Sequence, residues 1–121
     1  MSVVLRGGRI IDSQGERLLD VELGEDGRIA AVGTGLSGDV NLDASGCVVS
    51  PGFVDLHAHL REPGLEEAET IQTGARGGSL GGYTALVAMP NTDPTTDCVA
   101  VVEQVRALGR RSTCEIIPTA A

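Results

Sequence analysis

The sequence feature that most constrains the fold is the apolar run Thr-Ala-Leu-Val-Ala-Met at residues 84–89. A short strand this uniformly apolar is typical of a parallel sheet that is covered on both faces. Helices are predicted on either side of it, at residues 66–80 and 97–108. Further strands are predicted at residues 53–59 and 114–118. The order is therefore β-α-β-α-β, which predicts an α/β fold with a parallel sheet and right-handed crossover connections.

The two helices are predicted from different signals. The acidic residues in 66–69 suit a helix N-terminus, because carboxylates there meet the positive end of the helix dipole. That helix is expected to run to about Leu80. In the second helix Asp97 is the expected N-cap and Gly109 the expected C-terminal stop. Its apolar side chains recur at i, i+3 and i+4 spacing, which predicts a buried face made of Cys98, Val101, Val102, Val105 and Leu108.

The first fifty residues follow a different pattern, of short strands separated by turns. Leu19, Val21 and Leu23 alternate with acidic residues, as in a half-buried strand. The Asp-Gly pair at 26–27 predicts a tight hairpin that returns through residues 28–32. Further short strands are predicted at residues 3–5, 9–11, 41–43 and 47–50. We therefore expect residues 1–50 to form a small antiparallel β unit and residues 51–121 to form the α/β unit.

Composition excludes several classes of partner. The chain has 121 residues, nine arginines, no lysine and a formal net charge of −8. Without clustered positive charge, we expect it to bind neither nucleic acid nor anionic membranes. No apolar run approaches the roughly 18–20 residues of a membrane span, and the first residues lack the pattern of a signal peptide. The chain is expected to be soluble and cytoplasmic.

The number and spacing of the cysteines also restrict the possible folds. The three cysteines are odd in number and widely spaced, and none belongs to a Cys-x-x-Cys pair. This excludes a disulfide framework and a zinc ribbon as the basis of the fold. We expect all three to be small buried apolar residues.

His57 and His59 are the only histidines of the chain. They lie two residues apart in a predicted strand, so both imidazoles should project from the same face. Two neutral imidazoles on one face can bind a zinc ion at about 2.0–2.1 Å each. The carboxyl end of a strand is also where the active sites of α/β barrels lie. Taken alone, the pair is equally consistent with an exposed strand end.

The residues around the histidines resemble a known family. Residues 51–64 read Pro-Gly-Phe-Val-Asp-Leu-His-Ala-His-Leu-Arg-Glu-Pro-Gly, which closely resembles the amidohydrolase superfamily signature in its dihydroorotase form. Similar residues continue through Glu69-Thr70, Thr73-Gly74, Gly81 to Thr84 and Met89 to Pro94. Residues 1–50 resemble the small β-sandwich portion that precedes the barrel in these enzymes. The resemblance therefore extends over essentially the whole chain.

This resemblance implies that residues 51–121 are the first β-α-β-α-β portion of a TIM-type (β/α)8 barrel. A closed barrel of this type needs roughly 250 residues, about twice the length of this chain. We therefore expect an incomplete barrel, belonging to an N-terminal segment of a dihydroorotase. The alternative is a small open three-stranded α/β domain that is complete in itself.

Dihydroorotases interconvert (S)-dihydroorotate and N-carbamoyl-L-aspartate in pyrimidine biosynthesis, using water activated by a metal ion to attack a ring amide carbonyl. By motif position, the resemblance implies that His57 and His59 ligate zinc, as one or two ions. It also implies that Arg61 and Asn91 hold the substrate carboxylate. An arginine presents a planar fork of donors to a carboxylate, and an asparagine adds a neutral donor. We expect Asp55 to orient an imidazole through its second ring nitrogen.

Other parts of such a site have no counterpart here. A catalytic zinc site generally has three protein ligands, whereas this chain offers two histidines and no lysine that could be carbamylated. In the family the remaining ligands and the general acid/base lie at later positions. We therefore expect no catalytic residue within the 121 residues, and an inactive isolated chain.

Two alternatives stay open in this comparison. The chain could be part of a catalytically silent dihydroorotase-like scaffold that assembles with aspartate transcarbamoylase. It could also be an allantoinase or a hydantoinase, although Arg61 followed by Pro63-Gly64 favours dihydroorotase. Assembly with further copies of the same chain is likewise left open.

Overall fold

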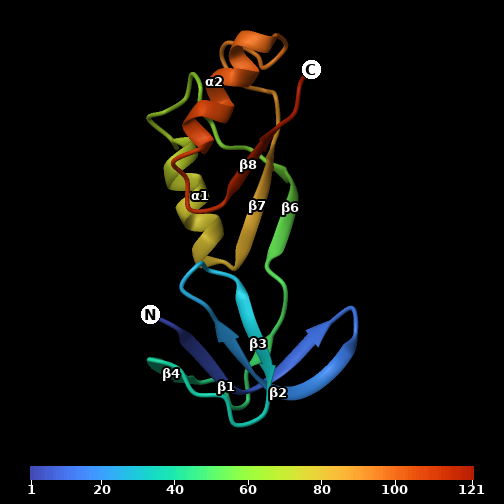
Figure 1. Cartoon of the computed structure of the whole chain (residues 1–121). Coiled ribbons are helices and arrows are strands. Elements are labelled where there is room, and N and C mark those ends of the chain that lie inside the picture. The colour runs from blue at the N-terminus through green and yellow to red at the C-terminus, as the bar shows by residue number, and fades with distance from the viewer. The chain divides into compact units, whose positions relative to one another are not determined.

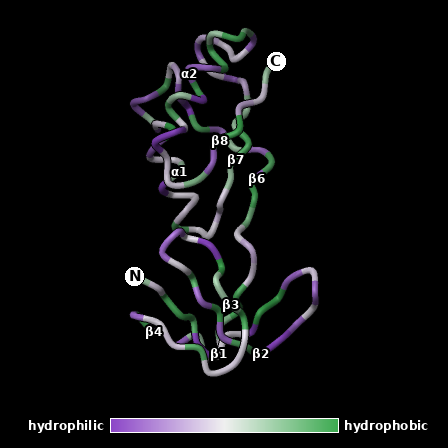
Figure 2. The backbone as a smooth tube through the Cα atoms, in the orientation of Figure 1, coloured by the Kyte–Doolittle hydropathy of each residue, from purple (hydrophilic) through white to green (hydrophobic).

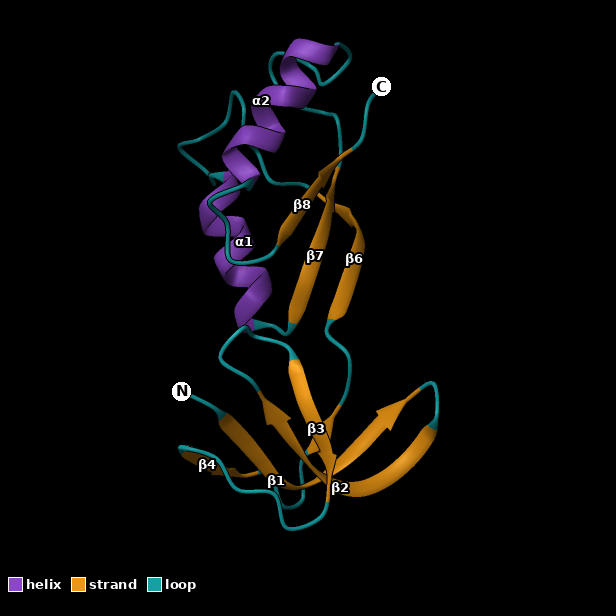
Figure 3. Cartoon of the chain, in the orientation of Figure 1, coloured by secondary structure: helices purple, strands orange, loops and turns teal.

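The computed structural model describes residues 1–121, which divide into two compact units, Met1–Pro51 and Gly52–Ala121 (Figure 1). The first unit is built of strands, and the second contains strands and helices (Figure 3). Neither helix combines the length and the apolar character that crossing a membrane would require.

The first unit is one connected five-stranded sheet. Its strands are β1 (Val3–Asp12), β2 (Gly15–Leu23), β3 (Ile29–Gly33), β4 (Val40–Asp43) and β5 (Val48–Val49). They run in the order β3-β2-β1-β4, and β5 also pairs with β1. The pairs β1–β2 and β2–β3 are antiparallel, as predicted, and the Asp-Gly turn joins β2 to β3.

The pairing of β4 and β5 corrects one prediction, because both strands pair with β1 in parallel and the sheet is therefore mixed. At the turn between them Ala44 donates to the carbonyl of Arg6, and Arg9 donates to the carbonyl of Cys47. The five strands form one sheet, and the β-sandwich portion stays a prediction.

The strand β1 is also longer than predicted. The pair Gly7-Gly8 was expected to separate two strands, but β1 continues through it with a shift of pairing register between Leu5 and Gly8. Gly7 takes a positive φ of 68° there, and its N–H donates to the buried carboxylate of Asp20 at 2.8 Å. This hydrogen bond satisfies a backbone group that the irregularity would otherwise leave unpaired.

The second unit confirms the predicted β-α-β-α-β order. Its elements are β6 (Phe53–Ala58), α1 (Ile71–Leu80), β7 (Tyr83–Ala88), α2 (Val99–Gly109) and β8 (Glu115–Pro118). The three strands form a parallel sheet in the order β6-β7-β8. α1 packs against β7 and α2 against β8, on the same side of the sheet (Figure 3).

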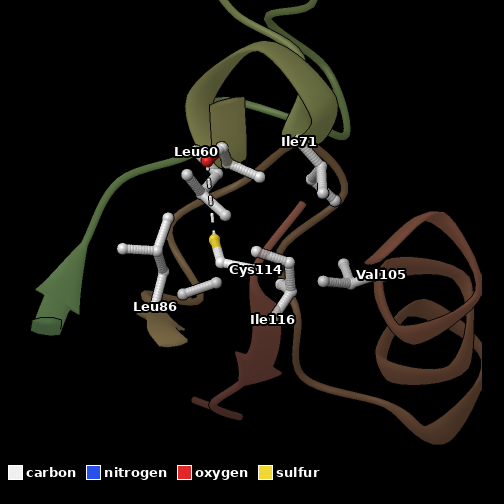
Figure 4. Packing of buried hydrophobic residues seen from close by; sticks show 8 residues of the cluster. Leu60, Ile71, Leu86, Val105, Cys114 and Ile116 are labelled. Carbon is white, nitrogen blue, oxygen red and sulfur yellow. Dashed lines mark hydrogen bonds between the residues drawn. The ribbon is translucent and has the colours of Figure 1, made fainter. Parts of the chain in front are cut away.

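Between the helices and the sheet lies the hydrophobic core of this unit (Figure 4). Its buried members are Leu60, Ile71, Ala75, Leu86, Ala88, Val105, Cys114 and Ile116. Burying one large aliphatic side chain contributes about 1.5–3 kcal/mol, so this cluster is the main source of stability for the unit. Cys114 also donates from its thiol to the carbonyl of Ala75 at 3.5 Å.

Both helices start later than predicted. α1 begins at Ile71, because Thr70 is the N-cap and exchanges hydrogen bonds with Thr73 in a capping box. The acidic residues at 66–69 lie in the turns before it. For α2 the N-cap is Cys98, whose side chain forms no capping bond. Its buried residues are Val101 and Val105, from the predicted apolar face.

The cysteine prediction is only partly right. All three cysteines are free, as expected, and Cys114 is buried. Cys47 and Cys98 are exposed, which contradicts the expectation that each fills a buried space.

Candidate functional site

The predicted site residues lie at the carboxyl ends of two neighbouring strands. Asp55 and His57 belong to β6, and His59 follows that strand directly. Arg61 lies in the loop between β6 and α1, and Asn91 in the loop between β7 and α2. Since β6 and β7 are parallel neighbours, their carboxyl ends meet at the same edge of the sheet.

The two imidazoles are close together on this edge. The ring centroids of His57 and His59 are 5.1 Å apart, and the ring planes make an angle of 67°. Both side chains are exposed. The i, i+2 spacing therefore places both rings beside one another, where solvent reaches them.

Asn91 reaches one of these rings from the neighbouring loop. The amide oxygen Oδ1 of Asn91 lies 2.7 Å from Nδ1 of His59, which is a short hydrogen bond. Residues 32 positions apart in the sequence are thus in direct contact. The resemblance to dihydroorotases implies that Asn91 binds the substrate carboxylate, but nothing in the spacing of the sequence indicates this contact with His59.

Asp55 has a different partner from the one expected. The sequence predicts an imidazole, whereas in the structure Oδ1 of Asp55 accepts from the backbone N–H of His57 at 2.9 Å. A carboxylate two residues before an N–H reaches it easily, which makes this a common local bond of aspartate. It satisfies the backbone where the pairing of β6 with β7 shifts register, between Asp55 and Ala58.

Arg61 is the only residue other than glycine with a positive φ, of 62°. A left-handed backbone costs a non-glycine residue roughly 1–3 kcal/mol, and such positions are frequent at ligand sites. Its side chain is exposed and takes part in none of the ion pairs of the chain. The guanidinium is therefore free to bind an anion, although it makes no hydrogen bond to either histidine or to Asn91.

Backbone contacts hold the two loops together. The N–H of Asp93 donates to the carbonyl of Pro63 at 3.0 Å. Beside this bond Gly64 has a φ of 104°, and a Cβ atom there would lie 2.2 Å from the carbonyl oxygen of Asp93. Only glycine fits this position without displacing one loop.

Hydrogen bonds within the loop between β7 and α2, which contains Asn91, also fix its conformation. Thr96 is 2% exposed, and its hydroxyl lies 2.9 Å from that of Thr92. The N–H of Thr96 donates to the carbonyl of Pro90 at 3.0 Å. Asn91 is therefore presented from a loop whose backbone is fixed on both sides of it.

Two acidic residues of the Arg61 loop have partners that the sequence does not indicate. Oε2 of Glu62 accepts from the N–H of Ile71 at 2.7 Å, which satisfies a free donor at the start of α1. Oε1 of Glu66 accepts from the N–H of Gly64, and this bond lowers the pKa of the Glu66 carboxyl. No regular spacing relates Glu62 to the helix that it caps, so the sequence gives no signal for it.

The edge is not a complete metal site. No group of three or more histidine, cysteine, aspartate or glutamate side chains is arranged to hold a metal ion. A hollow of the chain lies elsewhere, against Tyr83 and Glu115 at the amino ends of β7 and β8. The carboxyl ends of β6 and β7 therefore form an exposed surface that offers two imidazoles and one amide, and Arg61 lies in the loop that follows β6.

Comparisons of the sequence with known families and proteins all point to the same family. A family described as "Dihydro-orotase-like" matches residues 46–121. A protein of Solibacter usitatus named dihydroorotase is 48% identical over 115 residues, covering 88% of this chain and 26% of that protein. A dihydroorotase of Mycobacterium tuberculosis is 50% identical over 115 residues, covering 92% of this chain and 26% of that protein. The chain thus spans about a quarter of the length of these relatives.

Solved structures share the fold. The L-hydantoinase of Arthrobacter aurescens matches with a TM-score of 0.82 at 24% identity, covering 98% of this chain and 27% of that one. A dihydroorotase structure matches with a TM-score of 0.71 at 24% identity, covering 98% of this chain and 31% of that one. At this identity the likeness concerns the fold, which the two kinds of enzyme have in common.

Proposed function

Because the chain belongs to the dihydro-orotase-like family, we propose that it is the amino-terminal segment of a dihydroorotase, a cyclic amide hydrolase that interconverts (S)-dihydroorotate and N-carbamoyl-L-aspartate. The observation that carries this proposal is the edge formed by β6 and β7. There two imidazoles stand side by side, an asparagine contacts one of them, and an unpaired arginine follows two residues later.

The second unit is then the beginning of an α/β barrel. Parallel strands are normally buried on both faces, but here the helices lie on one side of the sheet. β6 is hydrophobic along much of its length (Figure 2), yet Phe53, Val54 and Leu56 are 58%, 52% and 74% exposed. Ile117 in β8 is exposed as well. Further strands and helices of a barrel would cover these side chains, and residues 1–50 would supply one sheet of the β-sandwich portion.

The donor set at the edge fits part of a zinc site. Imidazole nitrogens are ordinary zinc ligands, and His57 and His59 are close enough to share one ion. The chain supplies no third protein ligand, so the rest of the coordination would come from other parts of the enzyme. Zinc held there would supply Lewis-acid polarisation of the amide carbonyl and would make water more acidic.

Arg61 and Asn91 would bind and orient the substrate. The guanidinium offers paired donors to a carboxylate and supplies the charge that neutralises it. The amide nitrogen of Asn91 adds a neutral donor, since its oxygen is already used by His59. Holding the carboxylate at two points would fix the orientation of the substrate ring, which lowers the entropic cost of reaction. With two metal ligands and no general acid/base, we expect the isolated chain to be inactive.

A chimeric enzyme tests this function. Residues 1–121 are joined to the remaining part of the Solibacter usitatus relative, and the interconversion of dihydroorotate and N-carbamoyl-L-aspartate is measured with zinc present. We expect activity in the chimera and none in the 121-residue chain. His57→Ala and His59→Ala should each abolish it, whereas Cys98→Ser, a change at an exposed thiol, should not.

Circular dichroism and zinc content identify chimeras that fold and load metal. A folded, zinc-containing chimera without activity would overturn the proposal. Activity that survives His59→Ala would overturn it too, and robust turnover by the 121-residue chain alone would show that the site is complete without further residues.

A further inference from the structure

We propose that Asn91 is a positioning residue that fixes the tautomer of His59 and leaves the electron pair of its Nε2 atom free. The bond that carries this inference joins Oδ1 of Asn91 to Nδ1 of His59 at 2.7 Å. An amide oxygen can only accept, so Nδ1 of the imidazole must carry the hydrogen. In a neutral imidazole the other nitrogen is then the acceptor, and the atom that can bind a metal is Nε2.

His57, which lies in β6, offers an internal comparison with His59, which follows that strand directly. Its ring meets the ring of His59 at an angle but forms no hydrogen bond with another side chain. At His57 the backbone N–H, and not the ring, forms a hydrogen bond, which it donates to the carboxylate of Asp55. The tautomer of His59 is therefore set by a partner, whereas that of His57 is not.

The same amide has a second function available. With Oδ1 bound to His59, the Nδ2 group of Asn91 keeps both of its hydrogens for an anion. This part of the inference rests on the proposed function, in which that anion is the substrate carboxylate. Hydrogen bonds in a chain polarise one another, so an anion at Nδ2 would strengthen the bond at Oδ1. Asn91 would then couple substrate binding to the electron density on His59, because partners of metal-ligating histidines raise the basicity of the ring.

Nuclear magnetic resonance of the metal-free 121-residue chain tests the tautomer directly. Long-range proton–nitrogen correlations in alkaline solution show which ring nitrogen carries the hydrogen in each histidine. We expect His59 to carry it on Nδ1. In Asn91→Ala the ratio of tautomers should move toward the Nε2–H form by roughly fivefold or more, the effect of one lost hydrogen bond. Asn91→Asp keeps an acceptor and should retain the Nδ1–H form.

The signals of His57 serve as the control in every sample, because that ring does not depend on Asn91. The inference is overturned if His59 carries its hydrogen on Nε2 in the native chain, or if Asn91→Ala leaves its tautomer unchanged while the chain stays folded. It is equally overturned if Asn91→Asp behaves like Asn91→Ala.

Zinc titration of the same samples separates this inference from the proposed function. Loss of a partner that orients a metal ligand typically weakens metal binding by about 10–100-fold, so Asn91→Ala should bind zinc more weakly than Asn91→Asp. Failure of the native chain to bind zinc through its histidines would count against the proposed function alone. An Nε2–H tautomer in the native chain would count against this inference alone.

Discussion

The N–H of Asp93 donates a 3.0 Å hydrogen bond to the carbonyl of Pro63, and this bond joins the loop of Arg61 to the loop of Asn91. The two side chains proposed to bind the substrate come from loops that follow different strands. Their relative position therefore depends on this backbone contact and on the closeness of Gly64 to Asp93.

Gly64→Ala should disrupt this junction. The new Cβ would meet the Asp93 carbonyl oxygen at 2.2 Å, and the residue would also keep a φ of 104°. We expect a loss of about 1–3 kcal/mol in the free energy of unfolding, measured by urea denaturation. Gly77→Ala is the matched control, because nothing lies within 4 Å of that Cβ and the residue is helical. Gly77→Ala should stabilise the chain by about 0.5–1 kcal/mol. Equal stability of Gly64→Ala and Gly77→Ala would contradict the close packing of Gly64 against Asp93.

The core of the second unit is tested with two leucines. Leu86 is 4% exposed and Leu80 is 84% exposed. Leu86→Ala should lower the free energy of unfolding by about 2–5 kcal/mol, because it leaves a cavity among packed side chains. Leu80→Ala should change it by less than about 0.5 kcal/mol. Similar losses in both variants would mean that Leu86 is not a core residue.

The sequence predicts the second unit better than the first for a physical reason. An apolar strand between two amphipathic helices leaves few arrangements other than a parallel sheet, so the order of β6, α1, β7, α2 and β8 is local information. The direction of β4 and β5 is not local, because it depends on how the turn at 44–46 meets β1. The sequence prediction starts α1 too early, because acidic residues suit the first turn of a helix. In the structure the capping box at Thr70 sets the start of the helix instead.

The candidate site likewise has one part that the local sequence predicts and another part that it does not. The period of a strand predicts that His57 and His59 share a face, and the ring distance of 5.1 Å agrees with it. The contact between His59 and Asn91 could not be predicted, because it depends on the approach of two loops. The capping of α1 by Glu62 depends on tertiary structure for the same reason.

Acid should weaken the first unit through Asp20. The N–H of Gly7, and after it that of Leu36, bonds to this buried carboxylate, and these bonds lower the pKa of Asp20. A pKa that is lower in the folded state stabilises it above the unfolded value, and this stabilisation is lost as pH falls below about 4. Asp20→Asn should be less stable at neutral pH and less sensitive to acid between about pH 5 and pH 2.

Thermal unfolding followed by circular dichroism across this pH range checks the prediction. Asp97→Asn is the control, because Asp97 is exposed and its carboxylate forms no hydrogen bond in the structure. A native-like acid profile in Asp20→Asn would contradict the importance assigned to these bonds.

Arg61→Asn separates the charge of Arg61 from its backbone conformation. Asparagine tolerates a positive φ, so the loop should keep its shape while the guanidinium is lost. In the chimera we expect kcat/KM for dihydroorotate to fall by about 10–100-fold, mainly through KM, because a charge-assisted hydrogen bond is removed. Arg76→Gln, at an exposed residue of α1, is the control and should change neither constant. An unchanged KM in Arg61→Asn would remove Arg61 from the substrate site.

Zinc binding by the histidine pair tests the account most directly. It is followed through the ring proton signals of both histidines in the 121-residue chain carrying Cys47→Ser and Cys98→Ser, which removes the exposed thiols. We predict that His57 and His59 respond with one shared dissociation constant, and that His57→Ala and His59→Ala each weaken binding by about tenfold or more. A response from only one ring, or undiminished binding in both single variants, would contradict the claim that these imidazoles form half of a metal site.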